Sequence, residues 1–205
     1  MAKEQVSIVW FRRDLRLEDN TALNAALSEN KNVLPLFIFD DDILEELPKN
    51  DSRVNFIYEN LNKMHLRLRE ANSSMLVVRG KISEVWNKLL EAYSIQNVYT
   101  NKDYEPYAIS RDKQIASLLN EQGIELKLFK DQVIHEENEV LKGDGTPYTV
   151  FTPFKNKWLD VYTPQLPQSL TNIDNFHSKN YLFPEKEKLG IERSSIHVRP
   201  FTLEN

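Results

Sequence analysis

The strongest constraint on the fold is a repeated alternation between short apolar runs and helical patterns along the first 130 residues. The runs are nearly continuous, which is typical of strands that are buried on both faces, as in parallel sheets. Between the second and third runs, apolar residues recur every three or four positions, which is the spacing of one face of an amphipathic helix. The apolar runs occupy residues 6–11, 33–39, 75–78, 97–100 and 124–129.

This βα rhythm predicts an α/β domain over residues 5–130. The expected fold is a doubly wound, Rossmann-like sheet of five parallel strands in the order 3-2-1-4-5, with right-handed crossovers. A helix is expected at 21–29 with Asp19 or Asn20 as its N-cap, and Gly123 is expected to end the helix that precedes the last strand.

After this domain the rhythm breaks. Residues 131–163 form a predicted extension with a turn at KGDGT and a short helix that begins at Thr152-Pro153. Residues 164–205 are polar and interrupted by prolines, so we expect an extended linker over a surface. The expected helix of the extension would bury Phe154, Trp158 and Val161.

Composition excludes several classes of protein. The net charge is −5, so the chain lacks the basic surplus with which proteins usually hold DNA phosphates. There are no cysteines, no metal-ligand spacing of histidines, no apolar stretch of membrane-spanning length, and neither a GxGxxG nor a GxxxxGK[ST] motif. We therefore expect a cytoplasmic monomer without a metal site, and no catalytic set is apparent.

Ligands of open α/β sheets bind beyond the carboxyl ends of the strands, where the strand order reverses. Here that point lies between the first and fourth strands, so the loops FRRDLRLEDN (11–20) and NKDYEPY (101–107) should meet there. The loop 40–53 should flank them. The arginines of the first loop have a simpler alternative reading, in which they pair with Asp14, Glu18 and Asp19.

Two other polar or aromatic features have equally simple readings. The run Asp40 to Asp42 can be a solvated turn. The three tryptophans are more consistent with a core role than with a redox role. From the residues alone, the chain is a doubly wound domain with a polar crevice at the switch point.

Three stretches, VSIVWFRRDLRLEDNTALNAAL (6–27), NKDYEPYAISRDKQI (101–115) and GDGTPYTVFTPFKNKWL (143–159), resemble the DNA photolyase/cryptochrome family. The resemblance is nearest to class I cyclobutane pyrimidine dimer photolyases. It implies an α/β domain that precedes a helical domain, which holds FAD and receives UV-damaged DNA. Light-excited reduced flavin gives the dimer an electron, the ring splits, and the electron returns. The α/β domain usually carries a second, light-harvesting chromophore.

The helical FAD-binding domain is absent from this chain, so by resemblance the contacts to FAD and DNA lie elsewhere. Three functions remain open. The first is the light-harvesting domain of a deoxyribodipyrimidine photolyase, which FRRDLRLEDN favours by resemblance. The others are a cryptochrome-type blue-light signalling flavoprotein and a free-standing nucleotide-binding α/β protein.

The resemblance also implies a chromophore site. Folate-binding members carry an Asn-Glu pair where this chain has Tyr107 and Ala108. The form DYEPY instead resembles deazaflavin-binding members, so a deazaflavin-like chromophore is expected rather than methenyltetrahydrofolate. Asp103 and Arg53 match pocket residues of those members, and the ring requires an apolar slot with polar anchors. The predicted site consists of Phe39, Asp40, Arg53, Asp103 and Glu105.

We predict that the isolated 205-residue chain will neither bind FAD stoichiometrically nor repair thymine dimers under blue light. The reason is that, by resemblance, both functions require the helical domain. The measurement is a flavin titration, followed by an assay of dimer loss in irradiated oligonucleotide. Light-dependent repair by the purified chain would contradict the prediction.

Overall fold

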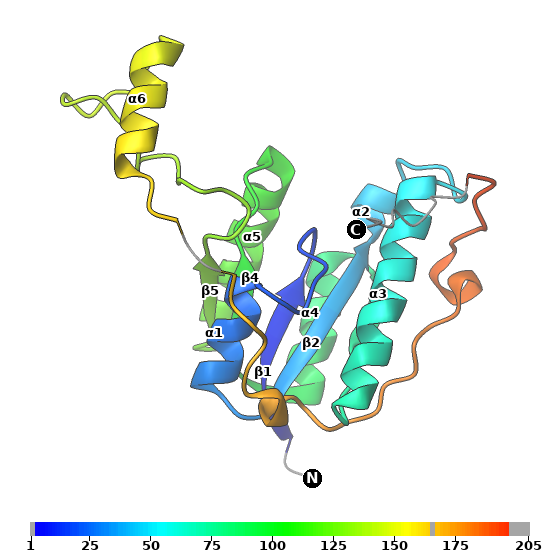
Figure 1. The fold of residues 1–205 in the computed structure, drawn as a ribbon. Coiled ribbons are helices and arrows are strands. Elements are labelled where there is room, and N and C mark those ends of the chain that lie inside the picture. Colours follow the sequence, from blue (N-terminus) through cyan, green and yellow to red (C-terminus); the bar gives the residue numbers. More distant parts are fainter. Residues whose placement is uncertain (1–2, 165–166, 197–205) are drawn as a thin grey trace, which may run out of the picture.

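The computed structural model describes residues 3–164 and 167–196 and contains five strands, six α-helices and two short 3-10 helices (Figure 1). The elements follow one another along the chain in the expected βα alternation. The elements are β1 (Glu4–Phe11), α1 (Thr21–Glu29), β2 (Val33–Asp40), α2 (Asp41–Leu44), α3 (Ser52–Glu70), β3 (Leu76–Gly80), α4 (Ile82–Ala92), β4 (Tyr93–Asn101), α5 (Pro106–Asn120), β5 (Glu125–Phe129), α6 (Phe151–Val161), η1 (Ile173–Asn175) and η2 (Lys186–Leu189).

The sheet confirms the predicted topology. Its order is β3-β2-β1-β4-β5, and every pairing is parallel. The β1 strand therefore lies at the centre, with β2 on one side and β4 on the other. The chain leaves β1 in one direction and later returns on its other side, which creates the switch point that the sequence predicted.

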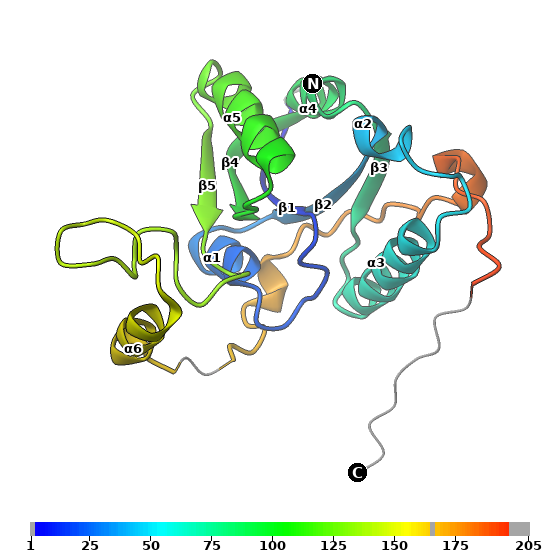
Figure 2. The same cartoon turned by 90° about the horizontal axis from the view of Figure 1, so that it is seen from above.

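Helices cover both faces of the sheet, as the apolar strands required. In β2, Val33, Phe37 and Phe39 pack on the face covered by α1 and α3. The alternate residues Leu34, Leu36 and Ile38 pack on the face covered by α4 and α5. Figure 2 shows the two helical layers from above. Because successive strand side chains point to opposite faces, one buried run supplies both cores.

Several boundaries differ from the expectation. The fourth strand begins at Tyr93, directly after α4, because its first residues pair with the start of β1. The run Asp40 to Asp42, which could have been a solvated turn, starts the short helix α2 instead. Asp40 is buried and is the N-cap of this helix, since its carboxylate accepts from the backbone N–H of Asp42.

The extension after β5 differs from the expected structure more than the α/β domain does. Its helix begins at Phe151, so Thr152 is not the N-cap, and Val150 stands at that position without a side-chain cap. None of the helix residues is fully buried; Phe154, Trp158 and Val161 are only partly covered. The helix α6 projects away from the sheet (Figure 1), and Trp158 packs against His135 and Tyr162 rather than in the main core.

The expected linker, 164–205, includes residues 165–166 and 197–205, which lie outside the described residues. Residues 167–196 run beneath the sheet and then up beside α3 (Figure 1). This segment, which we call the strap, is more firmly held than a polar linker would be, and Phe176 forms a parallel bridge with Val33. The strap residues that are buried in the body are Phe176, His177, Leu189 and Ile191.

We predict that His177 makes the fold sensitive to acid. Its side chain is 1% exposed, and burial lowers its pKa from the ordinary value, although the carboxylate of Glu4 at 3.7 Å opposes this shift. The unfolded chain therefore takes up a proton first. The contribution of the neutral, buried His177 to the free energy of unfolding should be fully present above about pH 6.5, which is the pKa of histidine in the unfolded chain. This contribution should be lost progressively as the pH falls below that value.

The test is thermal unfolding across this pH range for the wild type and for His177→Gln. The melting temperature of the variant should depend less steeply on pH, because glutamine does not titrate. Equal slopes for the two proteins would show that His177 is not responsible.

Candidate functional site

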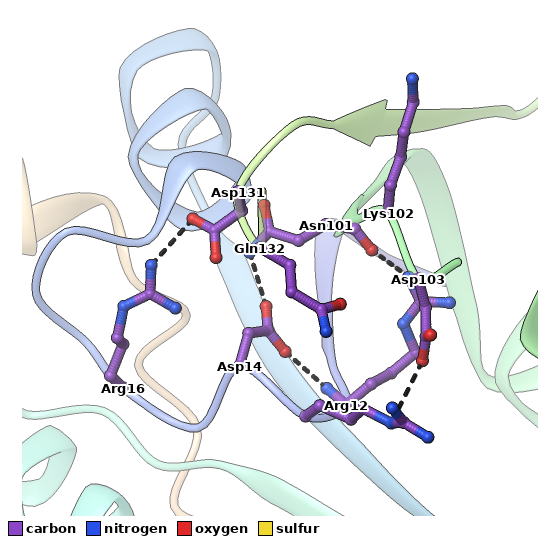
Figure 3. Close-up of a pocket in the computed structure, with 9 residues that line it drawn as sticks. Arg12, Asp14, Arg16, Asn101, Lys102, Asp103, Asp131 and Gln132 are labelled. Carbon is purple, nitrogen blue, oxygen red and sulfur yellow. Dashed lines mark hydrogen bonds and ion pairs between the residues drawn. The ribbon is translucent and has the colours of Figure 1, made fainter. Parts of the chain in front are cut away.

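The loops after β1 and β4 meet at the switch point, and they close the amino end of α1. Each of the first three backbone N–H groups of this helix has a side-chain acceptor (Figure 3 shows two of the three acceptors). Thr21 donates to Asp131, Ala22 donates to Asn101, and Leu23 donates to Asn20, at 3.1, 2.9 and 3.0 Å. In dinucleotide-binding folds a phosphate occupies this position. Here the protein's own side chains take its place.

One of the two predicted caps of α1 is correct. Asn20 is the N-cap. Asp19 is not a cap, because its backbone is left-handed with φ 53° and its carboxylate points to the strap, where it accepts from the N–H of Gln168 at 2.9 Å. Asp and Asn tolerate this conformation better than other side chains do.

The arginines of the loop 11–20 pair mainly with carboxylates outside it, which corrects the simpler reading of internal pairs. Arg12 bonds both oxygens of Asp112 at 2.5 Å. The side chain of Arg16 reaches Asp131 at 2.9 Å, and within the loop this side chain donates to the backbone oxygen of Asp19. Glu18 pairs with Arg67 on α3. The charged loop therefore connects the end of the central strand to α5, to the segment after β5 and to α3.

A pocket of about 340 Å³ lies among these groups (Figure 3). Two of its carboxylates are already paired: Asp14 accepts from Asn101 at 2.6 Å, and Asp103 lies 3.5 Å from Arg13. All nine residues that line this pocket have polar or charged side chains, so it offers a ligand no apolar side chain to pack against. We therefore place the candidate site elsewhere.

A larger cavity, of about 810 Å³, lies on the other side of β1, between the α2–α3 segment and the start of α5. All five predicted site residues line it, although they come from three separate parts of the chain. The apolar part of its wall comes mainly from β2, α2 and α3, and the polar part comes from the loops after β1 and β4, the end of β2, the α2–α3 segment and α5. The apolar side chains of the wall are Trp10, Phe37, Ile38, Phe39, Ile43, Leu44, Leu47, Val54, Ile57, Ile82, Pro106 and Ala108.

The predicted residues occupy two levels of this cavity. Phe39 and Asp40 are buried at the end of β2. The side chain of Asp103 is 8% exposed and is held by Arg13, whereas Glu105 stands at the surface. Arg53 is the outermost, with a side chain 72% exposed. The cavity thus has a mostly apolar interior and a charged rim.

Charge at the rim is largely paired. Arg53 forms a two-point ion pair with Asp51, at 3.1 and 2.7 Å, and this pair lowers the pKa of Asp51 to about 2. In the interior the pKa of a carboxylate shifts the other way. Burial raises the pKa of Asp40, although the hydrogen bond that the hydroxyl of Tyr107 donates to it acts against this shift. Burial and the neighbouring Asp40 also raise the pKa of Tyr107.

The sequence model of the DNA photolyase family matches residues 7–171. The chain belongs to the DNA photolyase family. A deoxyribodipyrimidine photo-lyase of Synechococcus sp. is 34% identical over 151 residues, which cover 74% of this chain and 31% of that protein. An archaeal photolyase structure from Sulfolobus tokodaii superposes with a TM-score of 0.75 at 30% identity, covering 94% of this chain and 43% of that one.

Photolyases are not the only relatives. Cryptochrome-2 of Gallus gallus is 27% identical over 201 residues, which cover 93% of this chain and 34% of that protein. The chain thus spans about a third of the length of these curated relatives and matches the N-terminal α/β domain that photolyases and cryptochromes share.

Two cavity residues of this photolyase-family domain are not among the site residues that the sequence predicts. Tyr107 was noted only as a departure from folate-binding members, and its bond to Asp40 joins parts of the chain that the sequence does not place together. Arg111 lies on the next turn of α5, and its guanidinium is 5.0 Å from the ring of Trp10. Both residues belong to the family motif NKDYEPYAISRDKQI. The sequence therefore contains them, but it does not show that they lie beside Asp40 and Trp10.

Among residues 3–164 and 167–196, no group of three or more potential ligands could hold a metal ion, and no helix is long and apolar enough to span a membrane.

We predict that Asn20→Ala lowers the free energy of unfolding by about 1 kcal/mol, because the N–H of Leu23 loses its acceptor. Urea unfolding provides the measurement. Asn156→Ala, at an exposed position of α6, is the matched control and should change stability by less than about 0.5 kcal/mol. Equal effects from both substitutions would show that the cap contributes nothing specific.

Proposed function

We propose that this chain is the light-harvesting-chromophore domain of a deoxyribodipyrimidine photolyase. The observation that carries the proposal is the cavity of about 810 Å³ at the switch point, with an apolar wall and a few polar groups. Sites for aromatic ligands are usually clefts of about 300–1,000 Å³ with this composition. Its volume and lining fit a tricyclic ring.

Named residues would hold such a ring. Phe39 and Ile57 offer apolar surface on one side of the cavity. Asp103, already inside the rim, can accept from ring or ribityl hydroxyl groups, and the exposed Arg53 can stack on the ring or bind an anionic group. Glu105 completes the rim beside Arg13. When bound, the chromophore would absorb light and pass its energy to a flavin.

A deazaflavin-like ring is favoured over methenyltetrahydrofolate. The positions that carry an Asn-Glu pair in folate-binding members hold Tyr107 and the buried Ala108 here, so the amide and carboxylate of that pair are missing. The Sulfolobus tokodaii photolyase is described as containing two FAD molecules and as implying a novel light-harvesting cofactor. That description supports a site for a flavin-sized ring within this family.

The catalytic role belongs to the longer protein in this proposal. Repair of cyclobutane pyrimidine dimers would use reduced FAD in a helical domain, and no residue of this chain is assigned to catalysis. The net charge of −5 agrees with a DNA-binding surface outside this domain. A class I photolyase remains our preferred reading because of the three motifs that carried the resemblance.

A cryptochrome-type signalling flavoprotein is the second candidate, and the similarity to cryptochrome-2 of Gallus gallus supports it. A free-standing nucleotide-binding protein is a weaker reading. The N–H groups at the amino end of α1, which such proteins offer to phosphate, are bonded to Asp131, Asn101 and Asn20.

We predict that Asp103→Ala weakens binding of 5-deazariboflavin to this chain by about tenfold or more, because the ring or its ribityl chain loses a charged acceptor. Fluorescence titration measures the dissociation constant. In a longer form that carries a flavin-binding domain, repair driven by direct flavin excitation should be largely unchanged.

Asp160→Ala serves as the matched control, since the side chain of this aspartate on α6 is 72% exposed and, among the described residues, pairs only with Lys157. It should leave the dissociation constant unchanged. The proposal fails if 5-deazariboflavin does not bind the wild-type chain, or if the two substitutions have the same effect.

A further inference from the structure

The third family motif, GDGTPYTVFTPFKNKWL, begins in a turn that does not line the cavity. This turn, residues 142–146, belongs to the loop beside α6, away from the sheet (Figure 1). Within it Asp144 is followed by Gly145, and this is the only Asp-Gly or Asn-Gly step in the sequence. Both residues are exposed, and Gly145 has a left-handed backbone with φ 80°.

An Asp-Gly step can rearrange without an enzyme. The backbone nitrogen of Gly145 attacks the side-chain carboxyl carbon of Asp144, and the amide proton and the carboxyl OH leave as water. Water then opens the resulting succinimide ring at either carbonyl, which gives back aspartate or gives isoaspartate. Glycine favours the attack because it has no side chain beside the nitrogen. The net change is an isomerisation, so no oxidant or reductant is consumed.

Both reacting groups are engaged in hydrogen bonds of the turn. The N–H of Gly145 donates to the backbone oxygen of Lys142 at 2.9 Å. Oδ1 of Asp144 accepts from the backbone N–H and from the hydroxyl of Thr146, at 3.0 and 2.7 Å. The N–H of Lys142 closes the turn on the backbone oxygen of Thr146 at 2.9 Å. Ring closure needs a free carboxyl and a free N–H, so these bonds must open first.

Thr146 acts on the carboxyl of Asp144 in two ways. Its hydroxyl and N–H fix the direction of the carboxyl, and they lower the pKa of Asp144 because they stabilise the ionised form. The ionised form is the less reactive one, since it has no OH group to leave as water. Pro147 follows Thr146 and restricts it to extended backbone conformations, so the donor itself has little freedom.

We propose that Asp144 is a site of spontaneous isomerisation to isoaspartate, and that Thr146 keeps this reaction slow in the folded chain. The site is independent of the cavity and of its ligand. Isoaspartate carries one extra methylene group in the main chain, which separates Lys142 from Thr146 by a longer path. The product therefore loses the pairing that closes the turn, in the segment that leads to α6.

The test follows isoaspartate at position 144 while the chain is incubated in warm, mildly acidic buffer. Peptide mapping with electron-based fragmentation distinguishes the two isomers, which have equal mass. The reference is a synthetic peptide of residues 140–149, in which the turn lacks the support of the folded chain. We expect the wild-type chain to isomerise about fivefold or more slowly than the peptide, because opening the turn breaks at least one net hydrogen bond.

Variants identify the protecting group. Thr146→Ala removes the hydroxyl donor and should raise the rate at Asp144 about fivefold. Thr146→Ser is the matched control, because it keeps the hydroxyl and should react close to the wild-type rate. Asp144→Glu should abolish the product at this position, because the longer side chain would have to close a six-membered ring.

Three results would overturn the proposal. If the wild-type chain reacts as fast as the peptide, the turn gives no protection. If Thr146→Ser reacts as fast as Thr146→Ala, the hydroxyl is not the protecting group. If the peptide itself gives no isoaspartate, position 144 is not an isomerisation site. Circular dichroism establishes that the variants are folded; if they are not, the comparison of the wild-type chain with the peptide decides.

Discussion

The buried carboxamide of Asn101 is the contact on which the switch point depends. From the end of β4, it accepts from the N–H of Ala22 at 2.9 Å and donates to Asp14 at 2.6 Å and to Asn20 at 3.0 Å. Its backbone oxygen also accepts from Arg12. One side chain thus fixes the loop after the central strand, the first turn of α1 and the neighbouring strand. Such fully satisfied buried networks specify a single arrangement of the chain.

This network explains where the cavity lies. In a doubly wound fold the helix that follows the first strand normally offers its N–H groups to a ligand, but here Asp131, Asn101 and Asn20 occupy them. The available space is on the other side of β1, beside β2, where Phe39 and Asp40 end their strand. The charged loop that follows β1 holds these segments together, and two of its arginines, Arg12 and Arg13, also line the cavity.

The strap adds a second constraint, because it connects the two ends of the domain. Ser73 donates to the backbone oxygen of His177 at 2.7 Å, and Tyr58 on α3 donates to that of Pro184 at 3.0 Å. Asn55, near the start of α3, also bonds the strap at Glu192. Because α3 begins beside Arg53, the strap supports the helix that forms one wall of the cavity.

The sequence by itself determined the strand order, the two-faced core and the switch point, because buried strands and amphipathic helices leave periodic patterns. It also gave the family and five residues that line one cavity. It did not determine the caps and pairs between distant segments. Asp19 was assigned to the helix but holds the strap, and the helix α6 was assigned a buried face that has no core to enter. Only the tertiary structure brought Tyr107 to Asp40, because this contact depends on how the end of β2 and the start of α5, 67 residues apart in the chain, converge.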